Sequence, residues 1–282
     1  MRQVLLACAL ASAAMGISAA AIAIDKPATA SQATATDALQ KAVAGSWRDP
    51  KNSARDRYRH PVETLAFFGV KPEQTVIEIT PGGGWYSEIL GPLLRERGHY
   101  IAAVPDPMAA EAGRSRDSRQ KAKSSLEAKF AAAPAQLDRA RVVAYDPDTP
   151  TFGAPGSADV VLTFRNVHNW RAAKQAEGMF RGFFAVLKPG GVLGVVEHRA
   201  ARDVDDDDKS GYVGEQQMVA MATAAGFRLD AKSEVNANPK DTKDYPGGVW
   251  TLPPTNDHDA KDDAKYQAIG ESDRMTLRFV KP

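Results

Sequence analysis

Short apolar runs of strand length alternate along the chain with longer segments whose apolar residues recur at helical spacing. The runs predicted as strands are residues 75–79, 100–104, 141–144, 158–164 and 192–197. Helical spacing occurs between them, in residues 85–97, 107–131 and 171–187. This alternation is typical of βαβ units. We therefore predict an α/β fold with a mainly parallel, doubly wound sheet covered by helices on both faces.

Further elements lie at both ends of this pattern. Additional helices are predicted at residues 37–44, 61–69 and 214–225. A strand at residues 227–233 is followed by a polar stretch rich in proline and glycine, residues 234–273, and by a closing strand at 275–280. A loop insertion of this length is either functional, for example a lid over the site, or a surface insertion without a role.

The first 23 residues have the pattern of an export signal. One positive charge at Arg2 precedes an apolar run that ends in small residues at 21–23. An uncleaved membrane anchor is the competing interpretation, because the run approaches the roughly 20 residues that span a bilayer. We expect cleavage of this signal peptide near residue 23, no stable membrane insertion afterwards, and export to the periplasm. Residues 24–45 are then a flexible lead-in with a short helix, and residues 46–282 form the main domain.

Charge and cysteine content narrow the range of partners. The chain carries 36 Lys and Arg against 35 Asp and Glu, a balance that argues against nucleic acid as a partner. Its single cysteine, Cys8, lies in the predicted signal. The mature protein therefore has no disulfide and no thiolate for nucleophilic or metal chemistry. We expect a small-molecule substrate, and the sequence leaves the oligomeric state open.

The end of the first predicted strand carries the strongest functional signal. Glu78 is followed there by a turn that contains Gly82, Gly83 and Gly84. A strand that ends in a glycine turn and continues as a helix presents unpaired N–H groups to a ligand. Glycine also lets a ligand approach the main chain closely. The turn therefore predicts a site for an anionic or polar ligand; a turn that merely joins strand to helix is the alternative.

The order of these elements resembles that of the class I S-adenosylmethionine-dependent methyltransferases, over residues 60–282. The resemblance rests on the glycine turn, on the Lys-Pro-Gly-Gly turn within residues 187–193 and on Ala-Gly-Phe at residues 225–227. More narrowly, residues 81–86, 163–170 and 197–199 resemble a family of predicted, exported bacterial methyltransferases. The resemblance implies one seven-stranded, Rossmann-like domain whose last strand is antiparallel. It also implies S-adenosylmethionine as cofactor and methyl transfer to an unidentified small-molecule acceptor.

The resemblance assigns the glycine turn to the methionine part of this cofactor. In the class the first strand ends in acid-x-Gly-x-Gly-x-Gly, and this chain reads Glu78-x-Thr80-x-Gly82-x-Gly84. It implies that these residues, together with Gly83, bind the amine and the carboxylate of the methionine part.

Two more cofactor contacts follow from the resemblance. The class places an acid for the ribose hydroxyls at the end of the second strand, where this chain has Val104. Asp106, two residues further on, is the candidate, and otherwise this contact is lost. Asp146, after the third strand, is the candidate for the adenine amino group, although Asp146-Pro147-Asp148 is also an ordinary turn sequence.

Catalytic residues are expected after the fourth strand, because open α/β sheets bind ligands beyond the carboxyl ends of their strands. Methyl transfer requires an aligned acceptor and, for an alcohol or acid carbon, a base. His168 is the predicted base, because imidazole titrates near neutral pH; Asn166 or Arg165 would orient the acceptor. In the alternative, Asn166 and His168 cap the next helix or bond to backbone groups. The Glu-His-Arg cluster at residues 197–199 has the same two interpretations.

We predict no metal site. His168, His198 and nearby carboxylates can converge at strand ends, but no tight ligand spacing supports a site. The acidic runs at residues 203–208 and 257–263 lack the pattern of a calcium loop.

Two other functions remain open from the sequence. A dehydrogenase that uses NAD would place a pyrophosphate on the glycine turn, but Ser87 stands in place of its third glycine. A non-catalytic ligand-binding or structural protein that retains the fold is the stronger alternative, because Thr80 and Val104 depart from the cofactor pattern.

Overall fold

The structure is a computed structural model that describes residues 30–282; the predicted export signal lies outside the described residues. Seven strands form one sheet in the order β3-β2-β1-β4-β5-β7-β6. The strands are β1 (Thr75–Ile79), β2 (His99–Pro105), β3 (Arg141–Tyr145), β4 (Ala158–Phe164), β5 (Leu187–His198), β6 (Arg228–Ser233) and β7 (Arg274–Val280). β1 to β5 pair in parallel, whereas β7 is antiparallel to both β5 and β6. This confirms the predicted sheet and its antiparallel last strand.

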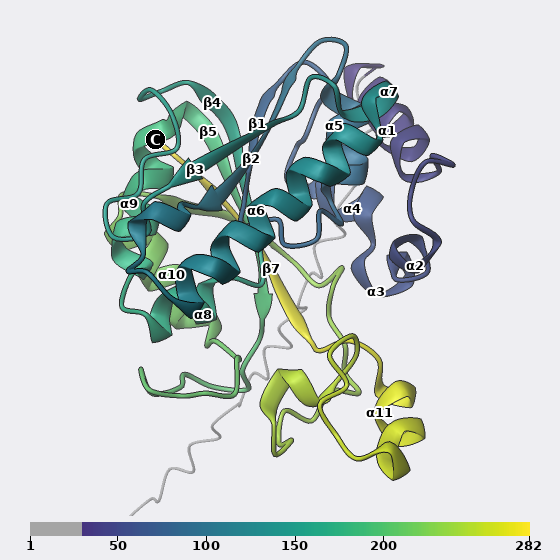
Figure 1. Ribbon diagram of the computed structural model, residues 1–282, viewed down its shortest axis with the longest axis vertical. Helices are drawn as coiled ribbons and strands as arrows, with labels where there is room; N and C mark the ends of the chain where they lie inside the picture. Colours follow the sequence, from purple (N-terminus) through teal and green to yellow (C-terminus); the bar gives the residue numbers. More distant parts are fainter. Residues whose placement is uncertain (1–29) are drawn as a thin grey trace, which may run out of the picture.

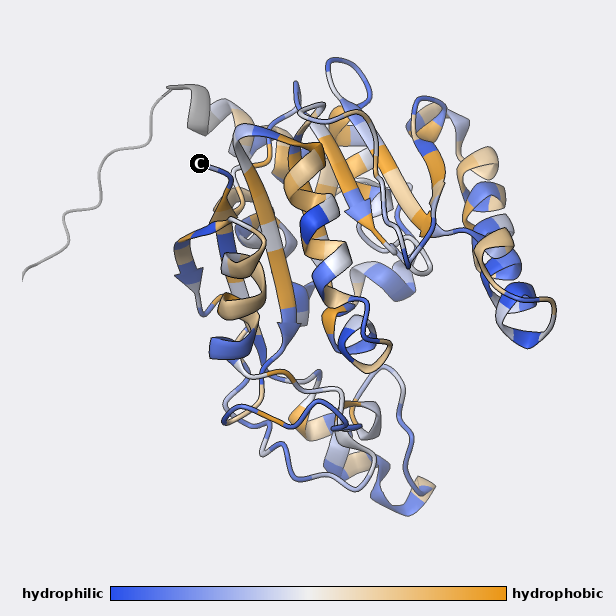
Figure 2. Cartoon of the chain, turned by 90° about the vertical axis from the view of Figure 1, so that its left-hand side faces the viewer, coloured by the Kyte–Doolittle hydropathy of each residue, from blue (hydrophilic) through white to orange (hydrophobic). Residues whose placement is uncertain are grey.

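Helices cover both faces of the sheet (Figures 1 and 2). Side chains of five helices pack on one face: α1 (Ala30–Val43), α4 (Pro61–Phe67), α5 (Ser87–Leu94), α6 (Arg114–Ala132) and α7 (Pro134–Leu137). The other face packs against α8 (Val167–Ala172), α9 (Ala176–Val186) and α10 (Glu215–Ala224). The short helices α2 (Pro50–Ser53) and α3 (Asp56–Arg59) connect α1 to α4.

Strand β1 illustrates why the core strands are continuously apolar. Side chains alternate between the two faces of a strand, so Ile77 and Ile79 join the cluster with α8 to α10, and Val76 joins the opposite cluster. Both faces are covered, so neither set of side chains contacts water. Glu78 is the exception within this strand: it is a carboxylate with only 2% exposure.

The helices differ from the sequence predictions mainly at their ends. The expected helix over residues 107–131 divides into η1 (Pro107–Ala109) and α6, separated by Gly113 at φ +133°. The expected helix over 171–187 divides into α8 and α9, and α8 begins earlier because the Glu197 carboxylate accepts hydrogen bonds from the backbone N–H groups of Val167 and His168. α1 packs into the core through Leu39, so the folded domain begins within the segment predicted as a lead-in.

The segment at residues 234–273 lies between β6 and β7 and is partly ordered into short helices. It contains η2 (Gly248–Thr251), η3 (Ala260–Asp262) and α11 (Asp263–Ile269). β7 starts opposite the end of β5, with Arg274 paired to His198. The segment therefore emerges at the carboxyl ends of the parallel strands, at the lower end of the molecule in Figure 1. Within residues 30–282, no helix is long and apolar enough to cross a membrane.

Candidate functional site

A cavity of about 400 Å³ opens at the carboxyl ends of β1 and β4. These two strands are neighbours where the strand order reverses, which is the position at which open α/β sheets bind ligands. The residue directly after each strand, Thr80 after β1 and Arg165 after β4, borders the cavity with a left-handed backbone, at φ +50° and +61°. Non-glycine residues adopt this conformation at a cost of about 1–2 kcal/mol, and such strain concentrates at functional sites.

The glycine turn forms one wall of the cavity. Thr80 has φ +50°, and its Oγ1 lies 2.9 Å from the Tyr145 hydroxyl. Gly82 and Gly83 line the cavity, and a Cβ built on either would have no atom within 4 Å. The main chain at these two residues is therefore accessible to a ligand.

Gly84 differs from the other two glycines. It is buried, and a Cβ there would lie 3.0 Å from Leu126, 3.1 Å from Ser87 Oγ and 3.3 Å from Lys129. A side chain at this position would collide with side chains of both α5 and α6. Gly84 therefore serves the packing of the turn, and a ligand in the cavity would meet Gly82 and Gly83 first.

Glu78 borders the cavity from beneath the turn. Its Oε2 accepts a hydrogen bond of 2.5 Å from the Tyr100 hydroxyl, which in turn lies 2.7 Å from Ser87 Oγ. Burial raises the pKa of Glu78 to about 7, against the opposing effects of the Tyr100 hydrogen bond and of distant arginines. A cationic ligand group at this position would favour the ionised carboxylate.

The candidates for ribose and adenine lie outside the cavity lining. Asp106 caps the turn η1 by accepting a hydrogen bond of 2.8 Å from the Met108 N–H, and Val104 is buried in the core. Asp146 accepts hydrogen bonds from the Asp148 N–H and the Thr149 hydroxyl. Those contacts, led by the Asp148 N–H, lower the pKa of Asp146. The roles of Asp106 and Asp146 toward a cofactor stay predictions.

His168 and Glu197 form a hydrogen-bonded pair at the cavity. His168 Nδ1 lies 3.0 Å from Glu197 Oε1, and the Glu197 side chain is fully buried. The carboxylate can only accept, so Nδ1 is the donor and Nε2 is left free to take a proton. The indole of Trp250, with its ring centroid 5.9 Å away and nearly perpendicular, packs beside the imidazole.

Asn166 has a positioning role in the fold. Its Nδ2 donates to the carbonyl of Ile79, at 3.0 Å, and to Thr163 Oγ1, at 3.2 Å. These bonds tie the end of β4 to the end of β1. Only the side-chain carbonyl of Asn166 is left for a ligand in the cavity.

His198 lies beside His168, with ring centroids 5.4 Å apart, and its Nδ1 lies 2.5 Å from Ser272 Oγ. Ligand atoms of His168, Glu197 and His198 come within 4.8 Å of one another. A cation there would compete with the backbone N–H of His198 and with His168 for Glu197 Oε1. Burial, followed by the charges of His168 and Arg165, holds the pKa of His198 well below its usual range.

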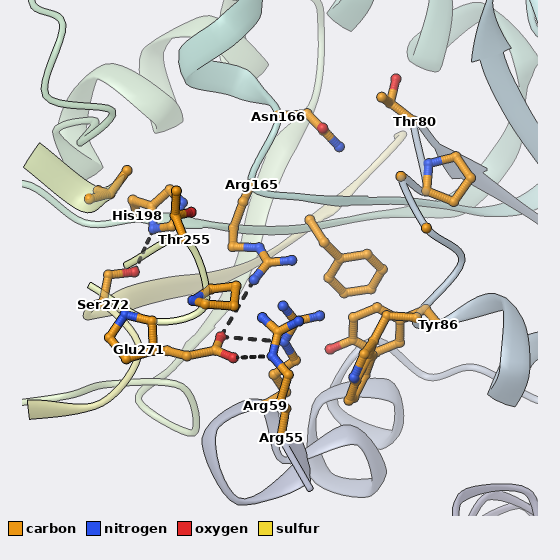
Figure 3. A pocket seen from close by; sticks show the side chains of 18 of the residues that line it. Arg55, Arg59, Thr80, Tyr86, Arg165, Asn166, His198, Thr255, Glu271 and Ser272 are labelled. Carbon is orange, nitrogen blue, oxygen red and sulfur yellow. Dashed lines mark hydrogen bonds and ion pairs between the residues drawn. The ribbon is translucent and has the colours of Figure 1, made fainter. Parts of the chain in front are cut away.

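A group of arginines lies on the opposite side of the cavity (Figure 3), and of its members only Arg165 was predicted from the sequence. Four arginines from three segments of the chain converge on the carboxylate of Glu271. The distances are 2.7 Å for Arg55 Nε, 3.3 Å for Arg59 Nε, 3.5 Å for Arg165 Nη1 and 2.8 Å for Arg274 Nη1. We call these five residues the arginine cluster. The density of arginine in residues 48–59 is the only sequence signal for it.

The segment between β6 and β7 closes the cavity on the side away from the sheet. Val249, Trp250, residues 253–255, Glu271 and Ser272 all line it. The stretch predicted as either a lid or a plain surface insertion therefore forms part of the wall of the site.

Comparison with known proteins bears on the fold. No family model and no curated protein matches the chain. A SAM dependent methyltransferase from Aquifex aeolicus is similar over 88% of this chain and 98% of its own, with a TM-score of 0.54 and 15% identity. The chain has the class I methyltransferase fold. The [4+2]-cyclase SpnF matches 91% of this chain and 98% of its own, with a TM-score of 0.53 and 15% identity. The O-MT part of StiE matches 86% and 81%, with a TM-score of 0.51 and 15% identity.

At 15% identity, these likenesses show the fold of this chain and not its chemistry. One of these proteins is named as a cyclase, so chemistry has to be argued from the site of this chain.

Proposed function

We propose that the protein binds S-adenosylmethionine at the glycine turn and transfers its methyl group to a small-molecule acceptor. One observation carries this proposal: the accessible turn at Gly82 and Gly83 borders the same cavity as His168, which is hydrogen-bonded to Glu197. A group held at the turn and an acceptor beside His168 would thus share one cavity, as an in-line displacement requires.

The methionine end of the cofactor fits the residues present. Its carboxylate would meet the main chain at Gly82 and Gly83, where no side chain is in the way. Its ammonium would meet Glu78, whose Oε1 has no hydrogen bond within residues 30–282. The ribose end fits less well, because Val104 replaces the acid of the class. When bound, the cofactor supplies an electrophilic methyl group on sulfur.

His168 is the proposed base for an acceptor that must lose a proton. Glu197 fixes the tautomer by accepting from Nδ1, and it would stabilise the imidazolium that forms when Nε2 takes the proton. Glu197 also caps α8 through the Val167 N–H, at 2.6 Å, so the helix that carries His168 is held in place by the same carboxylate.

The proposal is tested by incubating the purified protein with S-adenosylmethionine and a panel of small hydroxy acids and phosphorylated alcohols. Mass spectrometry then follows S-adenosylhomocysteine and the methylated products. Formation of both in equal amounts, lost in His168→Gln, is the expected result. Binding of the cofactor without turnover on any acceptor would favour a non-catalytic ligand-binding protein. Absence of cofactor binding would refute the proposal.

A further inference from the structure

The arginine cluster has an excess of positive over negative charge beside the cavity. Four guanidinium groups face the single carboxylate of Glu271, which is 3% exposed. Arginine stays protonated under all ordinary conditions. Burial, and next the charge of Arg165, lowers the pKa of Arg59 well below its usual range. This is the effect expected when like charges are crowded away from water.

Three of these arginines line the cavity and still have free donors. Arg55 and Arg59 each donate to Glu271 through Nε alone, and Arg165 makes one long contact through Nη1. Arg55 Nη2 is buried and has no partner within residues 30–282. Arg59 is 4% exposed, with its guanidinium over the Trp85 ring at 4.7 Å. An unpaired buried guanidinium nitrogen is costly to leave unsatisfied.

Arg274 has a different position in the cluster. It lies outside the cavity lining and bonds to the Tyr58 carbonyl as well as to Glu271. It donates to the Glu271 carboxylate from outside the cavity lining. Glu271 in turn holds Arg55, Arg59 and Arg165 in one orientation, so their remaining donors are arranged before any ligand arrives.

The cluster lies apart from the glycine turn within the same cavity. Figure 3 shows Thr80 and Asn166 at one end and Arg55, Arg59 and Glu271 at the other, with Arg165 between them. Gly82 and Gly83 already offer main-chain donors to the carboxylate of a methionine moiety. A second anionic group is therefore needed to account for the three arginines.

We propose that the arginine cluster binds a carboxylate or phosphate group of the methyl acceptor, so that the substrate is an anionic small molecule. This inference rests on the proposed function, because it assigns the acceptor part of that site. Planar guanidinium groups form paired hydrogen bonds with carboxylate and phosphate oxygens, and the bonds are strongest where water is excluded.

The test is calorimetric titration with malonate and with inorganic phosphate at low salt, in the presence and absence of saturating S-adenosylhomocysteine. The variants are Arg55→Gln, which removes one cavity donor, and Arg57→Gln, a matched control. Arg57 lies two residues further on, in α3, is exposed and does not line the cavity. We expect one anion to bind per chain, about tenfold more weakly in Arg55→Gln and within about twofold of wild type in Arg57→Gln.

A third variant guards against an effect of misfolding. Glu271→Gln keeps a side-chain oxygen that can still accept hydrogen bonds from the arginines and orient them, but it removes the negative charge that opposes an anion. It should therefore bind phosphate or malonate more tightly than the wild type, and misfolding cannot produce a gain in affinity. The proposal is overturned if neither anion binds, if Arg57→Gln weakens binding as much as Arg55→Gln, or if Glu271→Gln binds more weakly.

The titrations with and without saturating S-adenosylhomocysteine distinguish this inference from the proposed function. Anion binding that persists at saturating S-adenosylhomocysteine assigns the cluster to the acceptor. Competition between the two would assign it to the carboxylate of the cofactor and overturn the inference while supporting cofactor binding. Failure of S-adenosylhomocysteine to bind at all counts against methyl transfer, whereas failure of malonate and phosphate counts against the anionic acceptor alone.

Discussion

Replacing Glu271 by glutamine removes the only carboxylate that the four arginines of the cluster share. Burial alone would raise the pKa of Glu271, but attraction by Arg274, then by Arg59, Arg165 and Arg55, lowers it to about 2. Against an unfolded value of 4.5, this shift corresponds to about 3 kcal/mol of stability at neutral pH. Removal of one partner from a buried ion pair costs about 3–5 kcal/mol. We therefore expect Glu271→Gln to lower the free energy of unfolding at pH 7 by about 3 kcal/mol.

The pH dependence separates this electrostatic loss from a general packing defect. As pH falls, the unfolded chain takes up a proton at this carboxyl before the folded protein does. The stabilisation is therefore complete above about pH 5 and is lost as pH falls toward 2. At pH 3 about half of it remains. The difference between wild type and Glu271→Gln should shrink accordingly.

Urea unfolding followed by circular dichroism at pH 7, 5 and 3 measures these differences. Glu96→Gln is the control, since Glu96 is an exposed acid that pairs with Arg95 at the surface, and it should change stability by less than about 1 kcal/mol at each pH. A loss below about 1 kcal/mol at pH 7 for Glu271→Gln, or a loss of the same size at pH 7 and pH 3, would refute the reasoning.

Three further substitutions test the other parts of the site. His168→Gln should abolish turnover, because it removes the base, while the affinity for S-adenosylhomocysteine stays within about twofold of the wild type, because the glycine turn is intact. An unchanged kcat would show that His168 is not the base. Glu78→Gln should stabilise the protein by about 3 kcal/mol at pH 8.5 and have little effect at pH 4. Burial raises the pKa of Glu78 from 4.5 to about 7, so the unfolded chain loses this proton at lower pH than the folded protein does, and the stability of the wild type falls as pH rises from about 4.5 to 7. Thermal unfolding at both pH values measures this, and an equal gain at both contradicts it. Gly83→Ala should weaken S-adenosylhomocysteine binding about tenfold at unchanged stability, whereas Gly84→Ala should cost about 1–2 kcal/mol of stability because Gly84 has a left-handed φ of +74° and close neighbours. Calorimetry measures the binding and urea unfolding the stability of both variants. A loss of stability in Gly83→Ala and a loss of binding alone in Gly84→Ala would contradict this prediction.

The sheet was predictable because its strands are buried on both faces. A strand covered on both sides is apolar at most positions, and residues 75–79 and 158–164 match β1 and β4 residue for residue. Helix ends were less predictable. The start of α8 depends on Glu197, which follows Val167 by 30 residues in the sequence and meets it only when β4 and β5 pair.

The sequence predicted one side of the candidate site. It did not predict the side that is formed by contacts between residues far apart in the sequence. The sequence placed the glycine turn and His168 correctly at the carboxyl ends of β1 and β4, because the topology of parallel sheets brings these ends together. It gave no indication that Arg55 meets Glu271, because 216 residues separate them. The motif also could not distinguish Gly84, which faces Leu126, from Gly83, which faces the cavity.

Thr80, which departs from the glycine of the class pattern, has a left-handed backbone of the kind that glycine adopts most easily. Its φ is +50°, and its hydroxyl is hydrogen-bonded to Tyr145. A threonine at this position is therefore compatible with a left-handed turn at the end of β1.

Calorimetric titration of the purified protein with S-adenosylmethionine, S-adenosylhomocysteine and NAD tests whether the glycine turn binds the methyl donor. We expect both adenosyl compounds to bind with one molecule per chain and Gly83→Ala to weaken the binding of both. Absence of binding by either compound at millimolar concentration would contradict this expectation, and binding of NAD alone would assign the glycine turn to a dinucleotide instead.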